Sequence, residues 1–478
     1  MERSGLALLI LVGCGILFTG LPAFVVLIIG ATLGACLGVA TDTFPLALLG
    51  ALPGRLINLF ESDLLQALPL YVTMGLLLDR LPVADALYRA SIAVLPRKPA
   101  APMLSGMMLG ALLGPMNGSV GASVLGLSRV VAPKLAAEGV PPAKREAIIA
   151  VASTLGVLVP PSLVLILFSD AMLNAHTFAV TQSGRDDRVI NTQDVFHAAL
   201  PIAGIFLVMC LALAWFSGRN VAGLPRREKL TFVQGLLAGF SLGALLLLLG
   251  GVATGYFYAV EAAAMGAFAL LTAGIVTGRL RGEVMRGLLR DAMAISGALF
   301  SLLLAATTFT LVLRLFGTDQ LVNNLVAKIP GGDIPATAAV LAVIGLCAFV
   351  LDAFEIIFVV LPIVLPPLLV RVADARWVSV LVLLTLQSSF LLPPFGYALM
   401  MVRGALKPAA PFKPFVKALA PFLLAQWLLL IVVLLTPRLV HVMDKDNLRM
   451  SAKPLSKEEI DKRFNDMFAL PPPPETSQ

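Results

Sequence analysis

Charged residues are scarce in this 478-residue chain: Asp, Glu, Lys and Arg together make up only 13% of it. Soluble domains carry about 25% charged residues. Hydrophobic residues reach 59% and the mean hydropathy is +0.94. The composition therefore excludes a soluble globular protein. Cysteine is also rare, and its four copies lie singly in apolar runs without C-x-x-C spacing, which favours core packing over disulfides or a metal site: Cys14, Cys36, Cys210 and Cys347.

The signatures of common catalytic sites are missing as well. The sequence contains no H-E-x-x-H, no G-x-S-x-G and no Walker A segment. These absences argue against an intramembrane enzyme and against a self-contained ATP-driven pump. The net charge of +7 does not indicate a nucleic-acid partner, because the basic residues lie in short segments between apolar runs.

Apolar runs of membrane-spanning length are what the chain has in abundance. Leu200–Phe216, Phe232–Leu249 and Ala292–Leu315 are examples. A helix needs roughly 20 residues to cross about 30 Å of hydrocarbon. The sequence predicts an all-α polytopic membrane protein with about ten to twelve spans. The first run continues past residue 20 without a clear cleavage site, so we expect a retained span rather than a signal peptide.

Basic residues predict the orientation of these spans. They flank the apolar pair 232–276 on both sides, and a further group without acids follows residue 402. By the positive-inside rule, both groups are expected in the cytoplasm. The first group is Arg219, Arg226, Arg227, Lys229, Arg279, Arg281, Arg286 and Arg290, and the second is Arg403, Lys407, Lys413 and Lys417.

Proline pairs recur at one fixed offset in two apolar halves. Pro133 matches Pro366, and Pro160-Pro161 matches Pro393-Pro394, each 233 positions apart. Matched helix breaks in two halves are the best sequence indication of the binding site of a secondary transporter. We therefore expect two inverted repeats that face each other across the membrane. The predicted halves are 1–220, with a hairpin at 103–135 and a broken helix at 148–169, and 221–440, with a hairpin at 336–371 and a broken helix at 376–403; a polar, Pro-rich tail covers 441–478.

The first hairpin is predicted to be re-entrant. Met103–Leu113 and Val120–Ala132 are each too short to cross a bilayer. The segment Gly114–Ser119 between them contains Pro and Gly and is not expected to stay helical. Irregular backbone at membrane depth must be buried in protein or line a wet cavity. A hairpin that enters and leaves on the same side satisfies this requirement.

Polar residues beside these breaks are the candidate site. Oxygen ligands without nitrogen or sulfur indicate a hard cation, and the lack of an acid-rich cage favours one or two monovalent ions over calcium. An acid at membrane depth is functional by default. The predicted sodium ligands are Asn117, Ser119, Ser123, Asp352, Glu355, Gln387, Ser388 and Ser389. The predicted substrate-binding residues are Ser153, Thr154, Pro160, Pro161, Ser162, Pro393 and Pro394. No other metal and no cofactor is expected.

Several of these residues have a second interpretation. Asn117, Ser119 and Ser123 either ligate sodium or only satisfy the broken backbone, since Asn-Gly is ordinary turn chemistry. Glu355 either binds an ion or pairs with an Arg of the scaffold. Arg314 and Arg403 either meet a substrate carboxylate or snorkel to the interface.

At these residues the chain resembles the large membrane subunit of tripartite ATP-independent periplasmic (TRAP) transporters. The resemblance covers nearly all of residues 1–440. Its matching pieces are Gly118–Ser123, Pro160-Pro161-Ser162, Tyr256–Ala264, Leu351-Asp352 and Ser389–Gly396. Within the family, Leu351–Ile357 looks like the branch associated with monocarboxylates, 2-keto acids or mannitol and chloroaromatic compounds. Glu355 departs from the apolar or small residue of the dicarboxylate and sialic-acid branches.

The resemblance implies a sodium-driven importer of an organic acid in the bacterial inner membrane, with an elevator-type architecture similar to the ion transporter superfamily. It also implies two partners, a small four-helix membrane subunit expected as a separate chain and a periplasmic solute-binding protein. The alternative is a stand-alone sodium–carboxylate symporter of the same architecture, without a binding protein. Neighbouring genes for the two partners would distinguish these functions.

Overall fold

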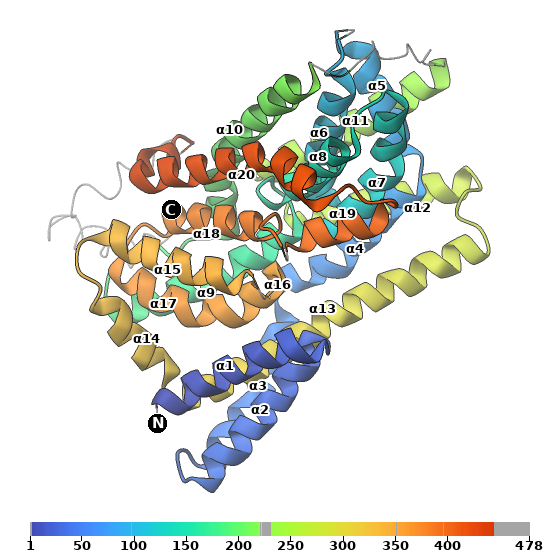
Figure 1. Cartoon of the computed structure of the whole chain (residues 1–478). Helices are drawn as coiled ribbons and strands as arrows, with labels where there is room; N and C mark the ends of the chain where they lie inside the picture. The colour runs from blue at the N-terminus through green and yellow to red at the C-terminus, as the bar shows by residue number, and fades with distance from the viewer. Residues whose placement is uncertain are drawn as a thin grey trace, which may run out of the picture.

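The structure is a computed structural model in which residues 2–96, 98–219, 221, 231–349, 351–394 and 396–443 are described. These residues form helices and no strand, as the composition predicts (Figure 1). Most of the predicted tail at 441–478, and the basic residues Arg226, Arg227 and Lys229, lie outside the described residues.

The helices of the first half surround one re-entrant segment and one interrupted helix. They are α1 (Glu2–Thr19), α2 (Ala23–Ala40), η1 (Leu46–Ala51), α3 (Leu52–Glu61), α4 (Asp63–Arg80), α5 (Val83–Val94), α6 (Ala101–Leu113), η2 (Gly114–Met116), α7 (Val120–Ala137), α8 (Pro142–Thr154), η3 (Leu155–Val157), α9 (Leu163–Ser183) and α10 (Thr192–Gly218).

The second half follows the same order after two long spans. Its helices are α11 (Phe232–Ala253), α12 (Ala259–Val276), α13 (Glu283–Leu315), α14 (Thr318–Ala327), α15 (Asp333–Cys347), α16 (Ala353–Glu355), the π turn η4 (Ile356–Val360), α17 (Leu361–Arg371), α18 (Ala375–Ser389), α19 (Tyr397–Ala405), α20 (Phe412–Leu435) and η5 (Pro437–Leu439).

Nine helices in the described residues are long and apolar enough to cross a membrane, or up to ten if α4 and α5, bent by 63° at their junction, form one span. Nine lies just below the predicted range of about ten to twelve and ten lies at its lower end, because several apolar runs are short helices. Large side chains such as Phe232, Phe240 and Phe268 are exposed on α11 and α12. Lipid is the solvent that suits such a surface.

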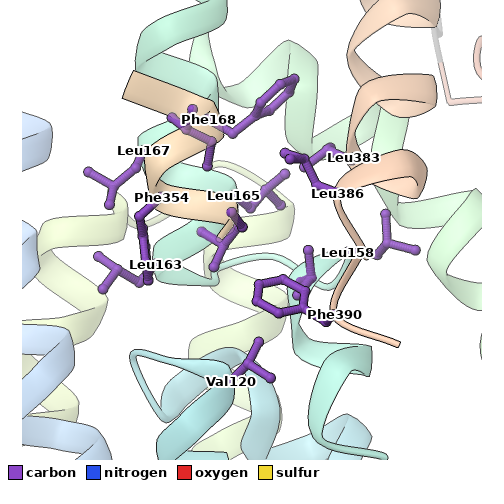
Figure 2. Close-up of a cluster of buried hydrophobic side chains, with 14 of the residues drawn as sticks. Val120, Leu158, Leu163, Leu165, Leu167, Phe168, Phe354, Leu383, Leu386 and Phe390 are labelled. Atoms are coloured by element: carbon purple, nitrogen blue, oxygen red, sulfur yellow. The ribbon is translucent and has the colours of Figure 1, made fainter. Parts of the chain in front are cut away.

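The centre of the molecule is built from the interrupted segments. Every residue of α8 from Glu146 to Thr154 is buried, and α18 is buried throughout except at Arg376. Figure 2 shows apolar side chains from both hairpins and both interrupted helices meeting in one cluster, with Val120, Leu158, Phe354 and Phe390 among them. Helices that are apolar on all sides belong in such a core.

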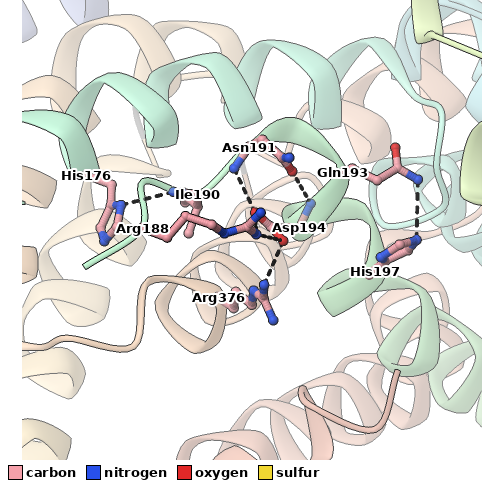
Figure 3. Close-up of polar contacts among 8 residues, drawn as sticks. All are labelled: His176, Arg188, Ile190, Asn191, Gln193, Asp194, His197 and Arg376. Atoms are coloured by element: carbon pink, nitrogen blue, oxygen red, sulfur yellow. Dashed lines mark hydrogen bonds and ion pairs between the residues drawn. The ribbon is translucent and has the colours of Figure 1, made fainter. Parts of the chain in front are cut away.

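The helices α8 and α18 begin at opposite ends of α10. The Lys144 ammonium donates a hydrogen bond to the Ser217 carbonyl, 2.7 Å away, at the last turn of α10. The Arg376 guanidinium pairs with Asp194, 2.6 Å away, at the first turn (Figure 3). Since α10 is a single helix of about 40 Å, α8 and α18 run in opposite directions beside it.

A second long helix, α20, also shows that α8 and α18 run in opposite directions. Near its start, the Ala410 amide donates to the Glu146 carboxylate of α8, at 2.5 Å. Near its end, the Trp377 indole of α18 donates to the Val433 carbonyl, at 2.8 Å. The two interrupted helices therefore start on opposite faces of the membrane-spanning layer.

The hairpins follow the same pattern. Just before the first hairpin, the Lys98 ammonium lies 4.7 Å from the centroid of the Trp215 ring, near the C-terminal end of α10. At the end of the second hairpin, the Leu369 carbonyl accepts a hydrogen bond from Arg185, 2.5 Å away, beyond the other end of α10. The first hairpin therefore opens toward one face and the second toward the other.

One expectation about the first hairpin is wrong. Its second arm does not stop at Ala132 but continues through Pro133 to Ala137, which gives an 18-residue helix of spanning length. Pro133 and Pro366 both lie inside helices and break neither. Because proline has no amide proton, Pro133 cannot donate the helical hydrogen bond to the Arg129 carbonyl. Arg129 is exposed, so solvent can donate to this carbonyl instead.

Candidate functional site

The tip of the first hairpin is an irregular turn between η2 and α7. The Ser119 hydroxyl accepts a hydrogen bond from the Ala122 amide, 3.1 Å away, and caps the N-terminus of α7. The Asn117 side-chain amide donates to the Ser123 hydroxyl, at 3.1 Å. All three predicted ligands of this hairpin thus take part in one local network of hydrogen bonds.

The first interrupted helix stops at Thr154, passes through η3 and resumes at Leu163. The Ser162 hydroxyl caps the new helix by accepting from the Leu165 amide, at 3.1 Å. Pro160 and Pro161 lie in the break, and their peptide bond is cis. The N-terminus of α9 lies beside the hairpin tip, since Ser162 and Leu163 border the same small space as Ser119 and Val120.

A small cavity of about 10 Å³ lies between this tip and this break. About 10–15 Å³ is the space that one water molecule needs, so the cavity has the size for one water or one small ion. The hydroxyl groups of Ser119, Ser153 and Ser162 line it, together with backbone of both segments. Gly114 and Gly156 allow this approach, since a Cβ on Gly156 would lie 2.3 Å from the Gly114 carbonyl carbon.

The hydroxyl groups around the breaks have already donated their protons, so their oxygen lone pairs are free for a ligand. Ser153 donates its proton to the Ala150 carbonyl, 2.7 Å away, and Thr154 donates to Val151, at 2.9 Å. In the second half, Ser388 donates to Thr385, at 2.7 Å, and Ser389 to Leu386, at 2.6 Å. A hydroxyl whose proton is already donated presents only oxygen lone pairs, which is the chemistry that suits a cation.

The second hairpin carries acids at the equivalent of the serine cap. Asp352 lies 233 positions after Ser119 and caps α16: its carboxylate accepts from the Glu355 amide, at 2.9 Å. The Glu355 carboxylate in turn accepts from the Asp352 amide, at 3.0 Å, which completes a capping box. No ion pair of Glu355 with an arginine is present among the described residues, so the expected scaffold partner is not found there.

Gln387 has a buried amide without a hydrogen-bond partner. Its side chain is fully buried, and neither its nitrogen nor its oxygen is bonded within the described part of the chain. Leaving such a group unpaired costs about 1–3 kcal/mol. The Pro393-Pro394 break follows six residues later, between α18 and α19. The Gln387 side-chain amide is therefore available to bind an ion or a substrate group.

The structure brings only some of the predicted sodium and substrate ligands together around one cavity. Ser119, Ser153 and Ser162 share one cavity, whereas Asp352 and Glu355 form a separate pair on the other hairpin. The Arg403 guanidinium pairs with the Glu146 carboxylate, 3.5 Å away, and donates to the Ala410 carbonyl, at 3.0 Å. No group of three or more His, Cys, Asp or Glu side chains able to hold a metal occurs among the described residues.

Two contacts of the site were not anticipated from the sequence. Gly75 of α4 lies directly against the first hairpin, because a Cβ there would meet the Asn117 carbonyl oxygen at 2.5 Å. The Tyr397 hydroxyl of α19 would lie 2.6 Å from a Cβ on Gly121 of α7, so the two halves meet there. Neither residue carries a local signal, because a glycine in an apolar run and a tyrosine at a helix start are both ordinary.

The comparison with protein families gives one match over most of the chain. The family described as tripartite ATP-independent periplasmic transporter, DctM component, matches residues 10–439. Among curated proteins, the chain is 22% identical to the 2,3-diketo-L-gulonate TRAP transporter large permease protein YiaN of Escherichia coli (strain K12), over 91% of this chain and 98% of that protein. It is 23% identical to the C4-dicarboxylate TRAP transporter large permease protein DctM of Rhodobacter capsulatus, over 74% of this chain and 81% of that protein.

A solved structure has the same fold. The crystal structure of the Alcanivorax borkumensis YdaH transporter aligns with a TM-score of 0.63 at 13% identity, over 80% of this chain and 86% of that chain. At this identity the likeness concerns the fold alone.

Proposed function

Because the chain belongs to the DctM component family of tripartite ATP-independent periplasmic transporters, we propose that it imports an organic acid with sodium as the coupling ion. The family makes it the large permease subunit of a secondary transporter rather than an enzyme. The proposed location is the bacterial inner membrane. The proposed partners are a small four-helix membrane subunit and a periplasmic binding protein that delivers the substrate.

The observation that carries the sodium proposal is the cavity of about 10 Å³ between the first hairpin and the first break. Three hydroxyl oxygens line it, and no nitrogen or sulfur side chain does. Sodium is a hard cation, and oxygen is the ligand that such cations prefer. Asp352, Glu355 and Gln387 support a second cation position in the other half.

The opposite directions of α8 and α18 support alternating access. Two interrupted helices that enter from opposite faces meet near the middle of the membrane, where inverted-repeat transporters hold their substrate. In the structure this meeting point is filled by the apolar cluster of Figure 2. We propose that the hairpins and interrupted helices of both halves move as one unit past the helices α2, α4 and α13.

The test is uptake into proteoliposomes that contain all three subunits. The labelled probe is the organic acid that most raises the melting temperature of the cognate binding protein. We expect uptake with an inward sodium gradient and without ATP. Equal uptake with a potassium gradient in sodium-free buffer would refute sodium coupling. Uptake without the binding protein would favour the stand-alone symporter.

Ser153→Ala tests the cavity itself. The Ser153 hydroxyl bonds only within its own helix, so its removal should leave folding intact and raise the sodium concentration for half-maximal uptake about tenfold, the loss of one oxygen ligand worth about 1.4 kcal/mol. Ser379→Ala is the matched control, since Ser379 is equally buried and donates to the Ala375 carbonyl, 2.7 Å away, outside the cavity. The same sodium dependence in both variants would show that Ser153 is not a sodium ligand.

A further inference from the structure

A cavity of about 760 Å³ is lined by none of the predicted sodium ligands, but it is lined by Arg314, one of the two arginines considered for a substrate carboxylate. One wall consists of α3 and α13, and the other consists of α9, η4 and α17. We call it the vestibule. Its volume is in the range of small-molecule sites, and much of its lining is polar, with Asn and Thr side chains on both walls.

The wall of α3 and α13 has one cation in excess. Arg55 and Arg314 both line the vestibule. Arg314 pairs with Asp319, its Nε lying 3.3 Å from the carboxylate, whereas Arg55 has no hydrogen bond or ion pair with any described residue. Burial and then the like charge of Arg314 lower the pKa of Arg55. Two arginines that share one carboxylate form a wall that attracts an anion.

The opposite wall accepts hydrogen bonds. Asp170 of α9 lines it, and the Asp170 carboxylate accepts a hydrogen bond from the Asn174 side-chain amide, 3.4 Å away. Pro362 and Pro366 also line it. Proline has no amide proton, so the carbonyls of Phe358 and Pro362 lose the α-helical donors that other residues would provide. Hydroxyl groups are donors that suit such a surface.

We propose that the vestibule binds a hydroxylated carboxylate, with the carboxylate on Arg55 and the hydroxyl groups on the wall of Asp170 and α17. The assignment rests on the proposed import of organic acids and names the chemical class of the substrate. A carboxylate with an apolar body would leave the half-buried Asp170 carboxylate with only the Asn174 amide, 3.4 Å away, as a donor. A polar group that loses hydrogen bonds on binding disfavours the wrong ligand.

The vestibule opens on the periplasmic side. Arg279, Arg281, Arg286 and Arg290 lie just before or in the first turns of α13, which places that end in the cytoplasm. Arg314 lies in the last turn of the same helix, 33 residues long, and so at the other end. The periplasm is the side on which a binding protein releases its substrate.

The first test measures the charge of each wall with two impermeant thiol reagents, one anionic (the sulfonatoethyl methanethiosulfonate) and one cationic (the trimethylammonium-ethyl methanethiosulfonate). Single cysteines replace Asn58, one turn from Arg55, or Asn174, one turn from Asp170, in a chain without Cys14, Cys36, Cys210 and Cys347. Both positions are exposed. The ratio of the two rates, anionic to cationic, is normalised to that of 2-mercaptoethanol.

We expect a normalised ratio of about ten or more at Asn58→Cys and below one at Asn174→Cys, because a charge about one helical turn away acts through a partly aqueous medium. Adding Arg55→Gln should bring the Asn58→Cys ratio close to one, while Arg55→Lys should retain it. An unchanged ratio in Arg55→Gln, with a normal size-exclusion profile, would overturn the role of Arg55.

The second test measures protection of Asn58→Cys. Gluconate should slow modification more than hexanoate, which has the same number of carbons without hydroxyl groups, and more than sorbitol, which lacks the carboxylate. Equal protection by hexanoate would overturn recognition of the hydroxyl groups, and protection by none of them would overturn the binding site. A lack of sodium-driven uptake would instead refute the proposed function. The rates of cysteine modification do not depend on transport, so they test the binding site separately.

Discussion

At the scale of single residues, Asp352 and Ser119 occupy the same place in two matched hairpins. Each caps the helix that follows it, one with a carboxylate and one with a hydroxyl. A cap contributes about 1 kcal/mol, so part of the importance of Asp352 is structural. The sequence alone could identify Asp352 as an unusual acid but could not show that its carboxylate already accepts a backbone amide.

Asp352→Asn separates the cap from the charge. Asparagine caps a helix as well as aspartate does, so we expect an unchanged melting temperature and a clear rise, about tenfold, in the sodium concentration for half-maximal uptake, equivalent to about 1.4 kcal/mol. Proteoliposome uptake over a range of sodium concentrations measures the effect. Asp374→Asn is the control, because Asp374 also caps a helix, accepting from the Trp377 amide 3.0 Å away, but lies outside the proposed ion sites. Wild-type sodium dependence in Asp352→Asn would leave Asp352 with a capping role only.

At the scale of elements, the first hairpin is seated on α4. The contact between Gly75 and the Asn117 backbone allows no side chain between them. Such a contact is invisible in the sequence, because residues 42 positions apart in two apolar runs carry no pairing signal. The breaks themselves could be predicted, since Pro and Gly act locally on the backbone. The continuation of α7 through Pro133 could not, because it depends on the exposure of Arg129.

Gly75→Ala should displace the hairpin tip. The new methyl group would meet the Asn117 carbonyl oxygen at 2.5 Å, and overpacking of this kind costs about 1–3 kcal/mol. We expect a lower melting temperature and a smaller stabilisation by sodium. Gly239→Ala in α11 is the control, since its Cβ meets nothing within 4 Å. If both variants melt alike and respond equally to sodium, the contact does not hold the site.

At the scale of the whole molecule, α10 and α20 fix the directions of the interrupted helices. The sequence could predict two halves with matched breaks from the 233-residue offset, whereas the cytoplasmic position of the basic loops stays a prediction. It could not provide the ion pairs and hydrogen bonds at the two ends of α10, which join residues far apart in the chain, such as Asp194 and Arg376. Nor could it assemble the vestibule, whose charged residues come from α3, α9 and α13.

Two exposed alanines, Ala137 at the end of the first hairpin and Ala373 just after the second, test these directions. Replaced singly by cysteine in a cysteine-free chain, they should react with an impermeant thiol reagent from opposite sides. In intact cells we expect labelling of Ala373→Cys alone, and in inside-out vesicles labelling of Ala137→Cys alone. Labelling of both from one side would contradict the opposed hairpins.

The attachment of α8 and α18 to opposite ends of α10 has a consequence for biosynthesis. The chain between them must cross the bilayer an odd number of times while the translocon inserts it. Loss of one crossing between residues 155 and 374 would send the basic segment with Arg403, Lys407, Lys413 and Lys417 to the outside, against its charge preference. Insertions and deletions of spans in this region are therefore tolerated only in pairs, so the gene can lengthen there by whole helical hairpins but not by single helices.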